Sequence, residues 1–289
     1  MTRTVSTSIS EGASAVAQAG AEVQRHASPW VERLARLGYA AKGVLYLLVG
    51  ILAVRAAAGW GGSVGSSRNA LSSLSGGTFG TILLWMIAVG LAGYALWQIF
   101  RAVLDPEDEG NELKGIATRI GFAVSAIIHA SLAVWVFTHL LTSREGGGSG
   151  GGSQGLVARV LEWGTAGRIA IAVAAVCIIG FAIQQLIKAW RVDLSDQLSL
   201  SRMSEGTRKA TIVTGRLGLA ARGIVFGIIG WFTLQAAWMA ASGEAGGLGE
   251  ALTTVGSFGP VMLGVVAAGL AAYGVFMLIK ARYRRISAR

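Results

Sequence analysis

The sequence has little charge, little proline and almost no cysteine. Only 14% of its 289 residues are charged, whereas soluble domains carry about a quarter, so the chain has too little polar surface for a soluble globule. Its three prolines, Pro29, Pro106 and Pro260, leave long stretches without a helix breaker. The single cysteine, Cys177, excludes an intrachain disulfide and a metal site built from cysteines.

Long hydrophobic runs are what the sequence has in place of charge. A helix needs roughly 20 apolar residues to cross about 30 Å of hydrocarbon. Six runs reach that length, at residues 38–58, 79–100, 118–141, 166–190, 217–241 and 258–280. They predict an all-α, multi-pass membrane protein.

Acidic residues are absent from all six runs. The 15 Asp and Glu residues lie outside them, so a cation channel or a proton pump driven by membrane carboxylates is not expected. The runs contain no acid/base pair, and the sequence has no zinc-binding H-E-x-x-H motif. We therefore expect no enzyme activity, no metal and no cofactor.

The net charge of +10 is concentrated between the runs. The N-terminal arm, the second and fourth loops and the C-terminal tail hold 18 Lys and Arg residues, whereas the other loops hold at most 4. Since Lys and Arg in short loops favour the cytoplasmic side, we expect both termini in the cytoplasm. This distribution accounts for the basic charge without a nucleic-acid partner.

The six runs form three versions of one unit, a pattern that decides the fold. Similar segments open the first, third and fifth runs: RLGYAAKGVLY at 36–46, RIGFAVSAIIH at 119–129 and RLGLAARGIVF at 216–226. Because each unit crosses the membrane twice, the units run in the same direction, related by an axis along the membrane normal. The prediction is a pseudo-threefold bundle of six transmembrane helices, made of three parallel-related helical hairpins.

The repeats divide the chain into four parts. We expect a disordered cytoplasmic arm at 1–28, the first repeat at 29–108, the second at 109–200, and the third with a basic tail at 201–289. The external loop of the second repeat contains a Gly/Ser-rich segment at 146–155, which its composition predicts to be a flexible coil.

The chain resembles a bacterial family of membrane proteins in the starts of its units, RLGYAAKG at 36–43 and RLGLAARG at 216–223, in its long first helix, in its Gly/Ser-rich loop and in the segment LLWMIAVGLAGYALW at 83–97. That family carries three copies of a domain of unknown function, each a pair of transmembrane helices. The resemblance covers about residues 36–282 and implies a bacterial plasma membrane protein, but it implies no activity. The middle copy departs from the pattern: Ser125 stands where the others have Lys42 and Arg222, and Cys177 stands where they have glycine. This departure argues against a site that needs three equal contributions.

Glycines recur within the runs. Gly223 and Gly227 form a G-x-x-x-G motif, and Gly43 and Gly50 lie two helical turns apart. Because small residues let membrane helices approach closely, we expect all four glycines at helix contacts. We expect Gln98, Gln184 and Gln185 to make hydrogen bonds between helices.

Lys42 and Arg222 are the candidate site, because they are charged, lie within the runs and occupy the same position in two repeats. One interpretation is that both side chains snorkel to phosphates at the cytoplasmic surface. The other is that they face the axis and bind an anionic headgroup or solute. Ser125 and His129 are also assigned to the candidate site. Ser125 occupies the equivalent position in the second repeat, and His129 lies one helical turn after it.

His129 lies about midway along the third run. A neutral histidine there is expected to hydrogen-bond across helices, and a proton relay and a haem ligand are its alternatives. His139 is ten residues away, about 15 Å of helical rise, which is too far for both to bind one metal.

Three functions fit these features. The first is a structural or accessory protein that associates with anionic phospholipid headgroups and possible membrane-protein partners. The second is a transporter or channel for an anionic solute or lipid along the pseudo-threefold axis. The third, an enzyme acting on lipid, has no supporting motif. Apolar side chains packed across the axis would favour the first, and a water-lined lumen the second.

Overall fold

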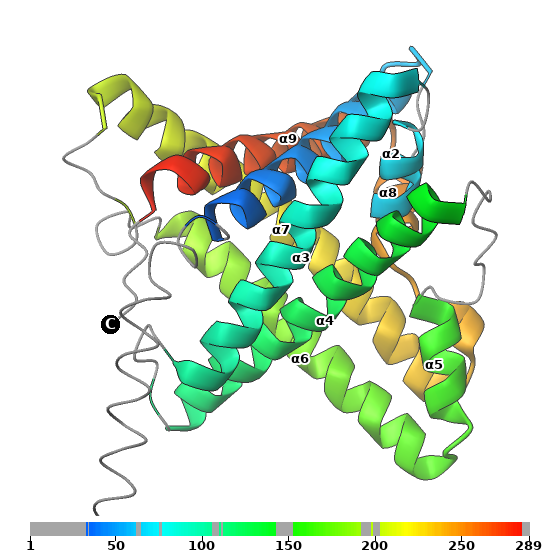
Figure 1. The fold of residues 1–289 in the computed structure, drawn as a ribbon. Coiled ribbons are helices and arrows are strands. Elements are labelled where there is room, and N and C mark those ends of the chain that lie inside the picture. Colours follow the sequence, from blue (N-terminus) through cyan, green and yellow to red (C-terminus); the bar gives the residue numbers. More distant parts are fainter. Residues whose placement is uncertain are drawn as a thin grey trace, which may run out of the picture.

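The computed structural model describes residues 33, 35–61, 65–74, 77–105, 110, 112–142, 153–191, 198 and 203–284. These residues are predominantly helical and contain six helices long and apolar enough to cross a membrane (Figure 1). The prediction of an all-α membrane protein with six spans is therefore confirmed. The arm at 1–28 and residues 146–152 of the Gly/Ser-rich segment lie outside the described part of the chain.

Six long helices supply the spans. They are the first span (Ala35–Ala57), α3 (Gly77–Leu104), α4 (Leu113–Thr142), α6 (Thr165–Trp190), α7 (Glu205–Met239) and α9 (Pro260–Tyr283). Each repeat also has a short helix before its second span: α2 (Ser67–Ser72), α5 (Ser153–Leu161) and α8 (Leu248–Ser257). Residues 153–155, which composition assigned to a flexible coil, thus belong to α5.

Helix α7 begins twelve residues before the predicted start of its apolar run at residue 217. The Ser204 hydroxyl caps it by accepting a hydrogen bond from the Thr207 N–H at 3.2 Å, and Glu205 pairs with Lys209 one turn later at 2.8 Å. These are the local signals that begin a helix. The hydropathy pattern predicted only the part of α7 that is apolar enough to lie in the hydrocarbon region of a membrane.

The six spans run between two ends of the bundle. The first span, α4 and α7 begin toward the left of Figure 1, where α3, α6 and α9 end. We call this the basic end, because these parts of the helices carry Arg36, Arg101, Arg119, Lys188, Arg216 and Lys280. The short helices α2, α5 and α8 lie toward the opposite end, on the right. The equivalent helices of the three repeats therefore run in the same direction, as the parallel arrangement predicts.

The second span of each repeat packs on the first span of the next. Helices α3 and α4 form one such pair, and α6 and α7 another. The third pair closes the ring: a Cβ added to Gly50 of the first span would lie 2.5 Å from the backbone N of Ala271 in α9. Three interfaces between repeats thus produce the pseudo-threefold arrangement.

The arginine that opens the repeat motif supports these interfaces. Arg36 donates a hydrogen bond of 2.8 Å to the carbonyl of Ala281 at the end of α9. Arg119 donates one of 2.9 Å to the carbonyl of Ala102 at the end of α3. A cation there satisfies unpaired carbonyls and complements the helix dipole.

The glycines of α7 approach α6 to different degrees. A Cβ at Gly223 would meet Leu186 at 2.6 Å, but one at Gly227 would meet only Ala182 at 4.0 Å. Gly230 instead makes the second close approach, 2.7 Å from Ile179. Both glycines of the motif therefore face α6, as the prediction requires, but only Gly223 is at a spacing too close for an added methyl group.

Apolar side chains from different repeats fill the interior. Val49 of the first span packs with Val225 of α7 and Leu270 of α9 in one core cluster. Leu45 of the first span packs with Leu91 of α3 and other residues of α3 and α4 in a second. The first span thus belongs to both clusters and joins all three repeats.

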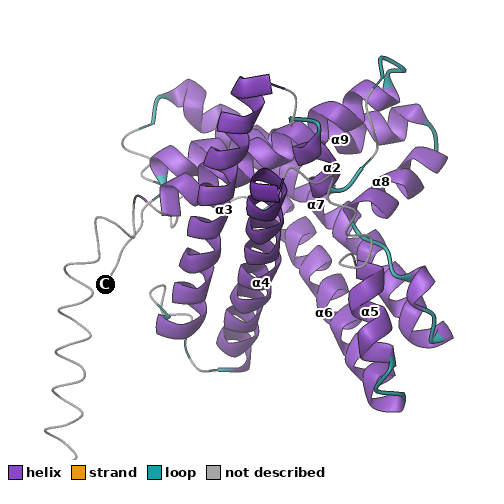
Figure 2. Ribbon diagram, turned by 45° about the vertical axis from the view of Figure 1, so that its right-hand side comes forward, coloured by secondary structure: helices purple, strands orange, loops and turns teal. Residues whose placement is uncertain are grey.

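The two spans of the second repeat diverge, unlike those of the other two. Gly38 lies against Tyr94 in the first repeat and Gly218 against Tyr273 in the third, where an added Cβ would come within 2.6 and 2.5 Å of the tyrosine. The equivalent Gly121 has no such neighbour within 4 Å. Figure 2 shows α4 and α6 separating from each other.

Candidate functional site

Lys42 lies inside the bundle, in the first span, with 5% of its surface exposed. Its Nζ donates a hydrogen bond of 2.9 Å to the hydroxyl of Tyr94 in α3. The same nitrogen lies 4.5 Å from the centre of the Tyr94 ring, within reach of a cation–π interaction. Its observed partner is therefore the neutral Tyr94 side chain.

Arg222 in α7 is buried in the same way, with 7% of its surface exposed. Its Nη1 donates hydrogen bonds to the Tyr273 hydroxyl at 2.8 Å and to the Gln185 Oε1 at 3.3 Å. Four aromatic rings surround its guanidinium carbon, at 5.6 Å (Tyr46), 5.6 Å (Phe181), 5.2 Å (Phe226) and 4.4 Å (Tyr273).

The two cation–tyrosine pairs are copies of one arrangement. Tyr94 and Tyr273 occupy the same position in their repeats, as Lys42 and Arg222 do. Neither cation extends to the basic end, so the arrangement differs from the snorkelling interpretation. The tyrosine hydroxyls offer acceptors inside the bundle, and the aromatic faces attract the charge.

Ser125 and His129 of α4 adjoin the Lys42 pair. The ring of His129 lies 4.6 Å from that of Tyr94, and its Nδ1 is 2.7 Å from the carbonyl oxygen of Ser125. This hydrogen bond lies within α4, so the predicted bond of His129 across helices is not observed. Helical geometry places residue 125 one turn before residue 129 and allows the local bond.

Tyr46 connects the two cations. It lies one turn after Lys42 in the first span, and its ring packs 4.8 Å from that of Tyr273. The guanidinium carbon of Arg222 lies 5.6 Å from the centre of the same Tyr46 ring. The four residues predicted from the sequence, Lys42, Ser125, His129 and Arg222, therefore lie close together. We call these four residues and their partners Tyr46, Tyr94, Gln185 and Tyr273 the cation site.

The cation site has more donors than acceptors. Lys42 and Arg222 carry more N–H groups than their three hydrogen bonds use. The Nε–H of Arg222 is buried and meets no hydrogen-bond acceptor among the described residues. A buried cation without a counter-charge is costly, so the site is chemically suited to an anion.

Sequence reasoning missed the aromatic and amide partners of the cations as site residues. The correspondence of Tyr94 with Tyr273 was a usable signal, because it repeats where Lys42 and Arg222 repeat. Of the glutamines, Gln185 bonds between helices as predicted. Gln98 instead accepts a hydrogen bond of 3.1 Å from Arg101 of its own helix, and Gln184 is exposed.

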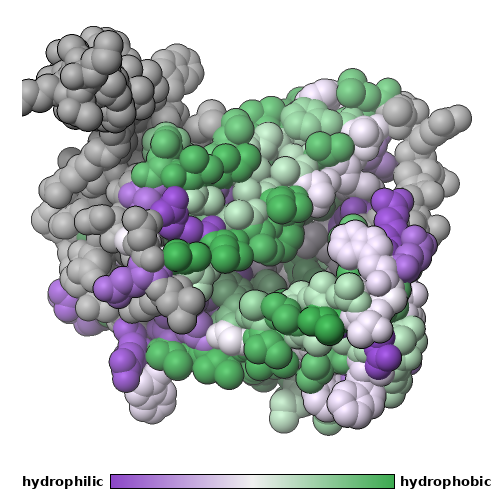
Figure 3. Space-filling view, turned by 90° about the horizontal axis from the view of Figure 1, so that it is seen from below, coloured by the Kyte–Doolittle hydropathy of each residue, from purple (hydrophilic) through white to green (hydrophobic). Residues whose placement is uncertain are grey.

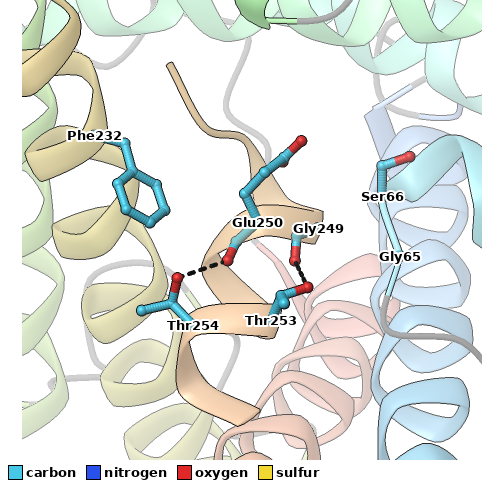
Figure 4. A pocket seen from close by; sticks show the side chains of 7 residues that line it. All are labelled: Gly65, Ser66, Phe232, Gly249, Glu250, Thr253 and Thr254. Carbon is cyan, nitrogen blue, oxygen red and sulfur yellow. Dashed lines mark hydrogen bonds between the residues drawn. The ribbon is translucent and has the colours of Figure 1, made fainter. Parts of the chain in front are cut away.

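A cavity of about 580 Å³ lies toward the opposite end, between the segment that precedes α2, Phe232 of α7 and helix α8 (Figure 4). Its threonine hydroxyls are used within α8: Thr253 donates to the Gly249 carbonyl at 3.0 Å and Thr254 to the Glu250 carbonyl at 2.9 Å. The Glu250 carboxylate accepts the N–H of Gly247 at 2.8 Å. Because these polar groups already have hydrogen-bond partners within the protein, this cavity is a weaker candidate for a binding site than the cation site.

Metal ligands do not gather in the described part of the chain, where no three His, Cys, Asp or Glu side chains form a group. Cys177 is exposed on α6. The chemistry available within the spans is therefore that of cations, aromatic rings and amides.

Comparison with known proteins agrees with the repeat architecture. Residues 37–105, 120–192 and 217–284 each match one family, the Domain of Unknown Function DUF1206. The chain is similar to the "Uncharacterized protein YxxB" of Bacillus subtilis (strain 168), with 33% identity over 268 residues, 92% of this chain and 96% of that protein. No solved structure matches it. The three matched segments follow the three repeats and cover more than half of the chain, which therefore belongs to the DUF1206 family.

Proposed function

We propose that this protein is a lipid-associated structural or accessory protein of the bacterial plasma membrane, which binds an anionic phospholipid by its headgroup at the cation site. Both termini lie in the cytoplasm in this proposal, so the basic end faces the cytoplasmic leaflet. The proposal includes no catalytic step, because the spans contain no acid/base pair. The proposed function is compatible with membrane-protein partners.

One observation carries the proposal: Lys42 and Arg222 are buried together, and all 15 carboxylates of the chain lie outside the apolar runs. Neither cation can pair with an acidic side chain of its own span. A phosphate oxygen would accept the donors that Tyr94, Tyr273 and Gln185 leave unused. The anion therefore balances charge that the protein itself does not balance.

The depth of the site fits a headgroup. Lys42 is six residues beyond Arg36, roughly 9 Å of helical rise from the basic end. Basic residues near a membrane surface attract anionic lipid by about 1 kcal/mol each. The basic end would gather such lipid, and the cation site would hold one molecule.

Packing along the interior favours this function over axial transport. The two core clusters join apolar side chains of the first span with those of α3, α4, α7 and α9. A polar path along the axis would have to pass through them. Transport of an anionic solute is the competing function, and the experiment below separates the two.

Native mass spectrometry of protein from nanodiscs of equal phosphatidylglycerol and phosphatidylcholine tests the proposal. We expect retained phosphatidylglycerol in wild type and at least about tenfold less in K42Q/R222Q, since a hydrogen bond to a charged group contributes about 1.5–3 kcal/mol. Arg55→Gln is the matched control, because Arg55 bonds the Trp60 carbonyl away from the site. Equal lipid retention in K42Q/R222Q and wild type would contradict the proposal, and a bound soluble anion in place of lipid would favour transport.

A further inference from the structure

We propose that the open face between α4 and α6 is a lateral groove for an acyl chain of the bound anionic phospholipid, which enters the cation site from the bilayer. This inference rests on the proposed function and adds where the lipid enters and what holds its chain. The repeat pattern does not predict the groove, because the spans diverge only in the second repeat.

Close packing in the first and third repeats depends on an alanine–glycine pair. A Cβ added to Gly90 of α3 would lie 2.4 Å from the Cβ of Ala41, and one added to Gly269 of α9 would lie 2.5 Å from the Cβ of Ala221. No real side chain tolerates such distances. The two spans of these repeats are therefore in contact only because glycine is present.

The second repeat replaces both members of this pair with larger residues. Val124 stands at the position of Ala41 and Ala221, and Cys177 at that of Gly90 and Gly269. Two larger side chains cannot occupy a gap that excludes one added methyl group. Helices α4 and α6 consequently pack on α3 and α7, respectively, and not closely on each other.

The separated faces form an apolar groove. Val124 is 50% exposed and Ile128 54% exposed on α4, while Phe181 is 37% exposed on α6 and Cys177 is exposed beside it. The two helices are the least buried of the six spans. Figure 3 shows the molecule from the side toward which they diverge, with a hollow between two largely hydrophobic bands.

Both walls of the groove lead to the cation site. On α6, the ring of Phe181 lies 5.6 Å from the guanidinium carbon of Arg222. On α4, His129 contacts Tyr94, which binds Lys42. The two buried cations therefore lie at the floor of an apolar opening, behind one aromatic residue on each side.

Charge and shape together select the occupant. The apolar walls suit a hydrocarbon chain, and the cations at the floor suit an anion. A neutral phospholipid would leave the cations without a counter-charge, and a free anion would leave the apolar walls without a hydrocarbon partner. An anionic phospholipid is the membrane component that satisfies both requirements.

Photo-crosslinking tests the groove in nanodiscs of phosphatidylcholine with a small share of phosphatidylglycerol that carries a diazirine in one acyl chain. We expect crosslinks to concentrate on the groove faces of α4 and α6. Cys177→Trp fills the groove and should reduce them severalfold. Val176→Trp is the matched control, because Val176 is the neighbouring residue, is 63% exposed and lies outside the groove, so its crosslinks should match wild type.

The outcomes separate the groove from the proposed function. Crosslinks that persist in Cys177→Trp, or that spread equally over other faces of the bundle, would overturn the groove. If phosphatidylglycerol retention nevertheless depends on Lys42 and Arg222, the proposed function stands without it. Crosslinking between two copies of the chain at this face would assign the groove to a second protomer and also overturn the inference.

Discussion

The Nζ of Lys42 and the hydroxyl of Tyr94 lie 2.9 Å apart, joining the first span to α3 inside the bundle. Arg222 and Tyr273 repeat this bond at 2.8 Å between α7 and α9. Each pair links the two spans of one repeat. In the second repeat Ser125 and Phe181 occupy these positions, so the cation–tyrosine bond is missing where the two spans separate.

Removing the acceptor hydroxyl should destabilise the fold. We expect Tyr94→Phe to lower the free energy of unfolding in detergent by about 1–3 kcal/mol, because the buried Lys42 ammonium loses its observed hydrogen bond. Tyr283→Phe at the basic end is the control for loss of a tyrosine hydroxyl. Equal melting temperatures of Tyr94→Phe and wild type would show that Lys42 does not depend on this bond.

Lys42 and Arg222 should act together on one anion. Titrating phosphatidylglycerol into K42Q, R222Q and the double variant should give a coupling free energy above about 0.5 kcal/mol. Both cations would contact the same phosphate, so removing the second cation should reduce the binding free energy less than removing the first. Additive effects would mean that the two cations bind separately.

The unequal distribution of Lys and Arg predicts the orientation of the protein in the membrane. Reporter fusions after Ser67 and after Gly151 should be external, and fusions after Lys114 and after Arg289 should be cytoplasmic. An external C-terminus would reverse the orientation and place the cation site near the outer leaflet.

Close helix contact makes Gly50 sensitive to a single methyl group. We expect Gly50→Ala to lower the melting temperature in detergent, because its Cβ would lie 2.5 Å from the Ala271 backbone N, an overpacking that costs about 1–3 kcal/mol. Gly180→Ala is the matched helical control, since nothing lies within 4 Å of its Cβ. Similar melting temperatures for the two variants would show that the first span and α9 are not in close contact.

Restoring the alanine–glycine pair should close the second repeat. In V124A/C177G, the distance between spin labels at Val134 of α4 and Val173 of α6 should shorten relative to a Cys177→Ala background. Both label positions are exposed, at 61% and 57%, and the variant leaves no native cysteine to react. An unchanged distance would show that residues other than Val124 and Cys177 hold the spans apart.

The sequence by itself determined the number of spans, their three-repeat order and the charged residues of the cation site with Ser125 and His129. Hydropathy and self-similarity are properties of a linear chain, so Lys42, Ser125, His129 and Arg222 could be selected before any contact was known. The early start of α7 was missed for the same reason, because its capped polar turns lie outside the apolar run.

Only the tertiary structure decided which way the two cations point and which hairpin opens. A lysine or arginine near a helix end can extend to the surface or turn inward, and here the tyrosines of neighbouring spans supply the partners. Likewise, Cys177 differs from glycine by one small side chain. We infer that this difference, together with Val124 in place of alanine, separates α4 from α6, because the equivalent gaps beside Ala41 and Ala221 leave no room for a Cβ.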